Sequence, residues 1–129
     1  MRVEKLIEEA KRARDRAYAP YSSFRVGAAL LDSEDRVFFG CNVENISFGL
    51  TMCAERVAIG AGVAAGSTAF KMIAVVSDSA QPVVPCGACR QVLAEFAPDL
   101  RVLSATLAGQ TMEWSMAMLL PSPTQGILR

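Results

Sequence analysis

TMCAER at positions 51–56 and PCGACRQ at positions 85–91 are the two stretches around which this chain is organised. The metal-ligating and proton-carrying groups that they offer are three thiols and one carboxylate, from Cys53, Cys86, Cys89 and Glu55. Three thiolates can hold a zinc ion and leave one position open, as catalytic zinc sites do. A carboxylate beside that opening can move protons. We therefore expect a catalytic zinc centre with Glu55 as its acid and base.

The spacing of these residues sets a condition on the local structure. Cys86 and Cys89 are three apart, so on a helix they lie about 60° apart and share one face. Such a pair alone also fits a thioredoxin-like redox motif. Cys53 and Glu55 are two apart and would diverge by about 200° within a helix. They can serve one site only if Cys53 lies at or before the start of its helix, where the helix N-terminus favours a thiolate.

Two arginines lie close to the candidate ligands in the sequence. Three thiolates around one zinc ion leave a net negative charge, which weakens the metal as a Lewis acid. Arg56 and Arg90 are placed to donate hydrogen bonds to the thiolates and draw off this charge. The alternative for each arginine is an ordinary surface ion pair. We expect Cys41, the remaining cysteine, to be a small buried residue and not a ligand.

Composition limits the class of protein. The length of 129 residues fits a single domain, 1–129, and 52% hydrophobic residues supply a core with some apolar surface left for subunit contacts. The formal net charge of +0 and the lack of a basic stripe argue against a nucleic-acid partner. No signal peptide or membrane-spanning run is apparent, so we expect a cytoplasmic protein without a membrane partner and without disulfides. Acid–base chemistry must come from carboxylates or from metal-bound water, because the chain has 0 histidines.

Hydrophobic periodicity predicts alternating helices and strands. The predicted helices cover 2–18, 52–65, 86–96 and 115–120, and the predicted strands cover 24–31, 36–43, 71–78, 101–107 and 111–114. The polar turn at 32–35 joins the first two strands as a hairpin. This order predicts an α/β sandwich with a mixed sheet.

Polar residues at the end of the second predicted strand form a further candidate group. Asn42 and Glu44 are two apart, so an extended chain places both side chains on the same side. They lead towards Cys53, which suggests that they belong to its site, and the alternative is that they face water at the end of a strand. Charges along the first helix, at Arg12, Arg14, Asp15 and Arg16, are typical of a solvated face.

The chain resembles a known family. Cys-Ala-Glu at 53–55 followed by Pro-Cys-x-x-Cys at 85–89 is a zinc deaminase signature. Together with the segments 17–22, 24–29 and 40–45, it resembles the small three-cysteine cytidine deaminases from about residue 17 to residue 121. The resemblance implies a three-layer sandwich whose mixed five-stranded sheet is flanked by helices. It also implies hydrolytic deamination of cytidine and deoxycytidine to uridine and deoxyuridine, with release of ammonia, in pyrimidine salvage.

The resemblance also implies roles for individual residues. It implies one zinc ion per subunit, a nucleoside substrate and a homotetramer whose sites borrow residues from neighbouring subunits. Carried over position by position, the zinc ligands are Cys53, Cys86 and Cys89, the proton shuttle is Glu55, the ribose hydroxyl is bound by Asn42 and Glu44, Phe24 packs against the nucleoside, and the backbone amide of Ala54 meets the base.

The sequence departs from the family pattern in two places and leaves rival functions open. Many relatives carry an aromatic residue after the Leu-Leu-Pro segment, but 122–129 has none, and Phe48 stands where many have tyrosine. The closest rival is a deaminase of the blasticidin S type, although the run Asn42-Val43-Glu44-Asn45 is of the nucleoside type. A nucleic-acid-editing deaminase conflicts with the neutral charge. A structural zinc module would need Cys41 as a fourth ligand and would leave Glu55 without a role.

Overall fold

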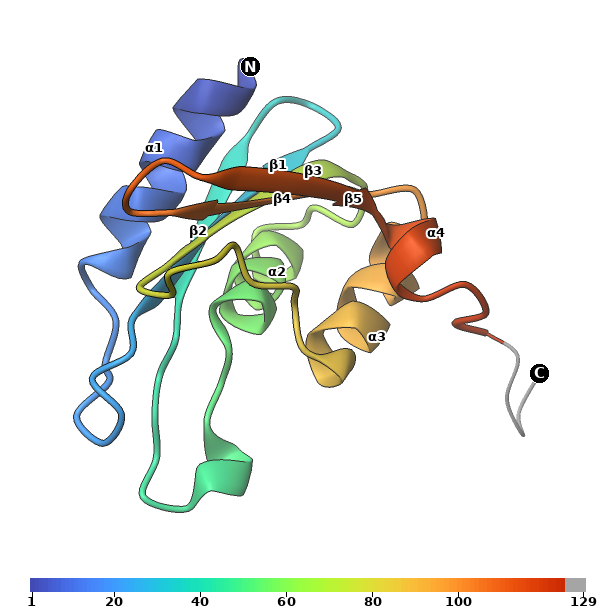
Figure 1. Cartoon of the computed structure of the whole chain (residues 1–129). Coiled ribbons are helices and arrows are strands. Elements are labelled where there is room, and N and C mark those ends of the chain that lie inside the picture. Colours follow the sequence, from blue (N-terminus) through green and yellow to red (C-terminus); the bar gives the residue numbers. More distant parts are fainter. Residues whose placement is uncertain (125–129) are drawn as a thin grey trace.

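The computed structural model describes residues 1–124, which form a sheet between two layers of helices (Figure 1). The sheet has five strands in the order β2-β1-β3-β4-β5. The elements are α1 (Val3–Arg14), β1 (Val26–Asp32), β2 (Val37–Cys41), the 3-10 turn η1 (Phe48–Leu50), α2 (Ala54–Ala64), β3 (Phe70–Ser77), α3 (Gly87–Phe96), β4 (Arg101–Thr106), β5 (Thr111–Ser115) and α4 (Met116–Leu119). The expected mixed five-stranded sheet is confirmed.

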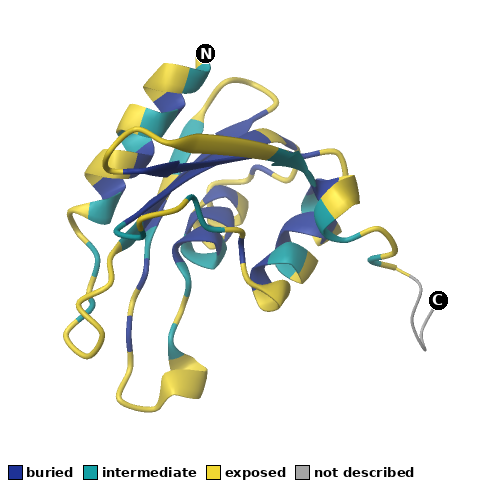
Figure 2. Cartoon of the chain, viewed as in Figure 1, coloured by how far each residue is buried: buried dark blue, intermediate teal, exposed yellow. Residues whose placement is uncertain are grey.

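Each face of the sheet packs against its own layer of helices. Successive side chains of a strand point to opposite faces, so Ala28 and Leu30 in β1 join one core while Ala29 and Leu31 join the other. The first core lies against α2 and α3, and the second against α1, which contributes Leu6. Figure 2 shows the buried residues along the strands and the inner sides of the helices. Within residues 1–124, no helix is long and apolar enough to cross a membrane.

Strand directions bring the starts of α2 and α3 to the same edge of the sheet. β3 and β4 are parallel and α3 connects them, so α3 begins near the end of β3. β1 is antiparallel to both β2 and β3, and through it Cys41 at the end of β2 is aligned with Val76 near the end of β3. Gly40 lies directly beneath Ala54, the first residue of α2. Both helix N-termini therefore meet at the carboxyl ends of the parallel strands, where α/β proteins build their sites.

The first helix and the first hairpin end earlier than the apolar pattern predicts. α1 stops at Arg14 because the chain beyond it pairs elsewhere: Tyr18 donates its N–H to the carbonyl of Asn42 and accepts the N–H of Glu44. The same pairing ends β2 at Cys41, so Asn42 and Glu44 follow the strand. Arg14 is also not part of a solvated face, because its Nε lies 2.5 Å from Asp78 and its side chain is 17% exposed.

Glycine at position 40 is required by the close approach of α2. A Cβ atom there would collide with the backbone of Ala54 and Ala58. We expect Gly40→Ala to lower the free energy of unfolding by about 1–3 kcal/mol, since backbone atoms cannot move aside as a flexible side chain can. Urea denaturation measures this loss. Gly60→Ala, in a helical position with nothing nearby, is the matched control and should raise stability by about 0.5–1 kcal/mol. Equal stability of Gly40→Ala and the parent would contradict the packing.

A buried carboxylate at the end of β1 makes stability depend on pH. Asp32 is 0% exposed and accepts hydrogen bonds from Arg36, Ser67 and the N–H of Glu34. Burial by itself raises the pKa of Asp32, but these hydrogen bonds outweigh it and lower the pKa from 3.8 to about 2. Because the folded pKa is the lower one, the stabilisation is present above the unfolded pKa and is lost as the pH falls from about 4 to about 2.

Comparison of the parent with Asp32→Asn tests this dependence. The difference in the free energy of unfolding between the two proteins should be largest above about pH 4 and should narrow towards about pH 2. Denaturation curves recorded at several pH values measure it. A difference that stays constant over this range would show that the carboxylate contributes nothing through its charge.

Candidate active site

The three candidate zinc ligands lie together in the folded chain. The Sγ atoms of Cys53, Cys86 and Cys89 lie within 4.8 Å of one another, and those of Cys53 and Cys86 are 3.9 Å apart. Thiolates bound tetrahedrally to zinc at about 2.3 Å lie about 3.8 Å from each other. No other group of three or more such ligands gathers within residues 1–124. The donor set and its spacing therefore fit one zinc ion with an open fourth position.

Two helix N-termini carry these ligands. Cys53 is the N-cap of α2, with extended backbone angles of φ −74° and ψ 153°, and Cys86 is the N-cap of α3. Cys89 lies in the first turn of α3 and is fully buried. The expectation that Cys53 precedes its helix is confirmed, as Ala54 is the first helical residue. The positive ends of both helix dipoles thus face the thiols and favour their ionised form.

Hydrogen bonds among the thiols shift the pKa values of Cys53 and Cys89 in opposite directions. A hydrogen bond from Cys89 is the largest cause that lowers the pKa of Cys53 to about 5, with Arg56 and Cys86 also contributing against the effect of burial. The same bond to Cys53, together with burial, raises the pKa of Cys89 far above its ordinary value. Cys53 is therefore ionised more readily than Cys89. Binding of a divalent metal by this set releases protons.

The carboxyl group of Glu55 lies buried in the first turn of α2. It is 5% exposed, and burial, with a further contribution from the nearby Cys53 thiolate, raises its pKa to about 7. A carboxyl group with a pKa near neutrality can accept a proton in one step and return it in another. The position and acidity of Glu55 therefore suit an acid and base beside the thiol cluster.

The two arginines contact different partners. Arg56 approaches Cys53, with 3.6 Å between Nη2 and Sγ, as expected. Its Nε is buried without a hydrogen-bond partner in the described structure, so a donor remains free for a second thiolate.

Arg90 does not make the expected contact with a thiol: it donates to the carbonyls of Pro85 at 2.7 Å and Leu119 at 3.3 Å. Its side chain runs back along α3 and braces the loop that precedes Cys86.

Cys41 lies outside the thiol cluster. It is half-buried instead of fully buried, and its Sγ lies 3.5 Å from the carbonyl of Arg16. Burial raises the pKa of this thiol. Because Cys41 is not among the clustered ligands, a closed four-ligand structural site does not form from the described residues.

Asn42 and Glu44 are buried and hydrogen-bonded instead of facing water. Each is 8% exposed. Asn42 donates to the carbonyl of Phe24 at 2.8 Å and accepts the N–H of Val26 at 2.9 Å. The amide nitrogen of Asn42 therefore keeps one N–H free, and its amide oxygen keeps one lone pair free. The alternative that the two residues are strand-end polar groups in water is wrong.

The carboxylate of Glu44 closes a turn of the chain. One of its oxygens accepts the N–H groups of Tyr21 at 2.9 Å and Ser22 at 3.2 Å, and the other accepts the hydroxyl of Ser22. The Ser22 hydroxyl is the largest cause that lowers the pKa of Glu44, and burial opposes it. Glu44 is therefore held as a carboxylate, with one lone pair still free on the oxygen that faces Ser22.

Backbone pairing connects Asn42 and Glu44 to the cysteine cluster. Val43, which lies between them, exchanges two hydrogen bonds of 2.9 Å with Met52, the residue before Cys53. This pairing fixes both side chains relative to the start of α2. Ala54, between Cys53 and Glu55, is 0% exposed.

Phe24 lies before β1 and is 38% exposed, so its ring is accessible for packing. Two residues for which the sequence predicted no role, Ser22 and Asp78, both hold the segment that carries Phe24. Ser22 lies within the motif at 17–22, and that was the one available signal for it. No pattern pointed to Asp78, because its partners are far away in the sequence.

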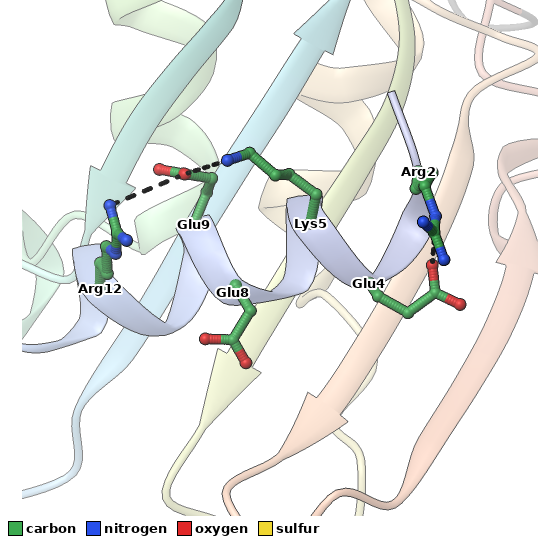
Figure 3. A pocket seen from close by; sticks show the side chains of 6 residues that line it. All are labelled: Arg2, Glu4, Lys5, Glu8, Glu9 and Arg12. Carbon is green, nitrogen blue, oxygen red and sulfur yellow. Dashed lines mark ion pairs between the residues drawn. The ribbon is translucent and has the colours of Figure 1, made fainter.

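Two hollows lie outside the cysteine cluster. The first, of about 380 Å³, lies on α1 and is lined by six charged side chains (Figure 3): Arg2, Glu4, Lys5, Glu8, Glu9 and Arg12. Glu9 pairs there with both Lys5 and Arg12, so the charges compensate one another at the surface. The second, of about 620 Å³, lies between α1 and β2. Neither contains any of the clustered cysteines.

Comparison with known proteins agrees with this geometry. The sequence model described as "Cytidine and deoxycytidylate deaminase zinc-binding region" matches residues 1–105. Three cysteines that can hold zinc, with a glutamate beside them as acid and base, are the signature of the zinc deaminase class. The chain belongs to the cytidine and deoxycytidylate deaminase family. Its three clustered cysteines fit the one zinc ion per subunit that the zinc-binding region of this family implies.

Two curated relatives and one solved structure show how far the similarity extends. The chain is 51% identical over 122 residues to a cytidine deaminase from Sporosarcina psychrophila, covering 94% of this chain and 90% of the relative. It is 50% identical over 117 residues to one from Halalkalibacterium halodurans, covering 90% and 89%. The crystal structure of a cytidine deaminase from Burkholderia pseudomallei superposes with a TM-score of 0.91 at 50% identity and covers 94% and 98%. The similarity thus spans nearly the whole chain.

Proposed function

We propose that this protein catalyses the hydrolytic deamination of cytidine and deoxycytidine to uridine and deoxyuridine, with release of ammonia, as a step of pyrimidine salvage. The observation that carries this proposal is the meeting of three thiols and a buried carboxyl group at the N-termini of α2 and α3. The relatives described above are named cytidine deaminases, which supports this substrate class. They give no support to the blasticidin S alternative.

Cys53, Cys86 and Cys89 would hold the zinc ion in this proposal. Zinc bound there supplies a Lewis acid that makes water acidic enough to act as a nucleophile at neutral pH. Arg56 offsets the negative charge of the thiolates through its contact with Cys53. Arg90 acts one step further away, by holding the carbonyl of Pro85 and so the loop that presents Cys86.

Glu55 carries the protons of the reaction. It first accepts a proton from the attacking water and passes it to the ring nitrogen beside the aminated carbon. As the new carbon–oxygen bond forms, that carbon becomes tetrahedral. Glu55 then transfers the second proton of the water to the amino group, and the carbon–nitrogen bond breaks to release ammonia. A pKa near 7 lets one carboxyl group perform both transfers.

The nucleoside would bind to residues that lie near the zinc ligands and Glu55. Asn42 and Glu44 receive the ribose hydroxyl, Phe24 packs against the nucleoside, and the backbone amide of Ala54 meets the base. The free hydrogen-bonding positions on Asn42 and Glu44 support this assignment, since both are otherwise fixed by internal bonds.

The assembly that we propose is a homotetramer of single-domain subunits, each comprising residues 1–129, in the cytoplasm. Large apolar side chains on the segment 43–52 support an oligomer: Ile46 is 77% exposed, Phe48 71% and Leu50 68%. This segment projects away from the sheet (Figure 1), and exposed apolar patches of this kind mark protein interfaces.

Four free cysteines fit the proposed location in a reducing compartment. The tail at 122–129, which lacks an aromatic residue, lies partly outside the described residues.

An assay with purified protein tests the proposed function. The absorbance change on conversion of cytidine to uridine is followed with and without a chelator, and deoxycytidine and blasticidin S are assayed in parallel. We expect turnover of cytidine and deoxycytidine that the chelator abolishes. Faster turnover of blasticidin S than of cytidine, or no turnover of either nucleoside by the zinc-loaded protein, would overturn the proposal.

A further inference from the structure

Side chains bind all three N–H groups and one carbonyl of segment 24–26. Its first N–H, that of Phe24, donates to the hydroxyl of Ser22 at 3.0 Å. Asn42 binds the carbonyl at 24 and the N–H at 26, and Asp78 accepts the N–H at 25 at 2.9 Å. Hydrogen bonds from three separate places therefore set the position from which the Phe24 ring projects.

Ser22 differs from the other two residues because its hydroxyl contacts two proposed substrate groups at once. It donates to the carboxylate of Glu44 and accepts the N–H of Phe24. A hydroxyl group has one hydrogen and two lone pairs, so both bonds can exist together. The bond to a carboxylate is charge-assisted and therefore stronger than a bond between neutral groups. The lowered pKa of Glu44, of which this bond is the largest cause, agrees with a strong contact.

The turn that contains Ser22 has a strained backbone and is held by hydrogen bonds to Glu44. Ser23 has a φ of 59°, in the left-handed region that residues other than glycine rarely adopt. The Glu44 carboxylate binds the N–H groups of Tyr21 and Ser22 immediately before this residue. These bonds compensate the strain and keep the Ser22 hydroxyl directed at Glu44.

We propose that Ser22 is a positioning residue of the nucleoside site, whose hydroxyl couples the carboxylate of Glu44 to the backbone of Phe24. This inference rests on the proposed function, in which Glu44 receives the ribose hydroxyl and Phe24 packs against the nucleoside. Loss of the hydroxyl frees the Glu44 carboxylate to rotate and leaves the Phe24 N–H without its acceptor. The substrate then has to order the Glu44 carboxylate and the Phe24 ring when it binds, and the cost of this ordering weakens binding. No hydrogen bond of Ser22 reaches the cysteines, so the chemical step keeps its geometry.

Steady-state kinetics of Ser22→Ala with cytidine test the coupling. We expect KM to rise by about tenfold, in line with a lost hydrogen bond to a charged group, while kcat stays within about twofold. Ser22→Thr keeps the hydroxyl and should restore most of the KM. Ser33→Ala, a serine replacement in the exposed turn at 33–35, is the matched control and should leave both constants unchanged. Zinc content and the thermal midpoint are measured for each variant.

Each outcome decides the inference. An unchanged KM in Ser22→Ala overturns it, and so does a parallel fall in kcat, zinc content and thermal midpoint, which would show a merely structural role. If Ser22→Ala does not fold, Ser22→Gly also lacks the hydroxyl but tolerates any turn geometry, and the same rise in KM is expected. The parent protein is assayed first: absence of cytidine turnover in the parent contradicts the proposed function, whereas normal KM values in an active Ser22→Ala contradict only the role of Ser22.

Discussion

Glu55→Gln is expected to lower kcat for cytidine by about 10²–10⁴-fold or more while the protein keeps its zinc. The amide has nearly the same size and shape as the carboxyl group, so it fits the same buried position in the first turn of α2. It cannot accept a proton, however, and none of the 129 residues is a histidine that could replace it. Both proton transfers therefore lose their carrier, whereas the thiols that would hold the metal are unchanged.

Turnover and bound zinc must be measured on the same sample of Glu55→Gln. Glu113→Gln is the matched control: the same replacement on exposed β5, where Glu113 pairs with Arg101, should leave kcat unchanged. Near-normal turnover by zinc-loaded Glu55→Gln would refute the assignment of Glu55 as the acid and base. Loss of zinc together with turnover would instead place Glu55 among the groups that hold the metal.

Cys89→Ser is expected to weaken zinc binding by more than about 100-fold and to abolish turnover. Changes to groups that only support a metal ligand already cost about 10–100-fold in affinity, so loss of a ligand should exceed this range. Within residues 1–124, the three thiols are the only candidate metal ligands that gather at this site, so no further clustered ligand is in place to substitute for Cys89. Because zinc stabilises the folded state that binds it, the thermal midpoint of Cys89→Ser should no longer rise when zinc is added.

Metal analysis after dialysis and a thermal melt with and without zinc measure these effects. Cys41→Ser is the control, since Cys41 lies outside the cluster and should leave the zinc content and turnover of the parent intact. Stoichiometric zinc in Cys89→Ser would exclude Cys89 as a ligand. A loss of zinc in Cys41→Ser would revive the closed structural site with four ligands.

The spacing of the cysteines and of Glu55 was sufficient to predict the local geometry of the site. Residues 86 and 89 must share a face of any helix that contains both, and Cys53 had to precede its helix for Glu55 to converge on it. The structure confirms that Cys53 precedes α2, as its N-cap. Cys86 lies one residue earlier than expected, as the N-cap of α3 and not within it, and its Sγ still lies close to that of Cys89. These relations depend on the fixed rotation per residue of a helix, so they can be derived without knowing the rest of the fold.

The sequence of helices and strands likewise indicated the class of fold, because each amphipathic element has to bury its apolar face. It did not indicate that the starts of α2 and α3 meet at one edge of the sheet. That meeting depends on strand order and direction, including the parallel pair β3 and β4 and the close contact at Gly40.

Partners that come from distant segments were decided only by the tertiary structure. Arg90 is near the cysteines in sequence but binds the carbonyls of Pro85 and Leu119, and Arg14 leaves its expected solvated face to pair with Asp78. Ser22 gained its importance from Glu44, which lies 22 positions later.

By itself, the sequence thus determined the type of fold and was sufficient to propose the ligand set and the acid and base, because these follow from residue chemistry and from helical and strand periodicity. The tertiary structure decided which backbone and side-chain groups surround them. Those contacts join segments far apart in the chain, and local periodicity carries no information about them.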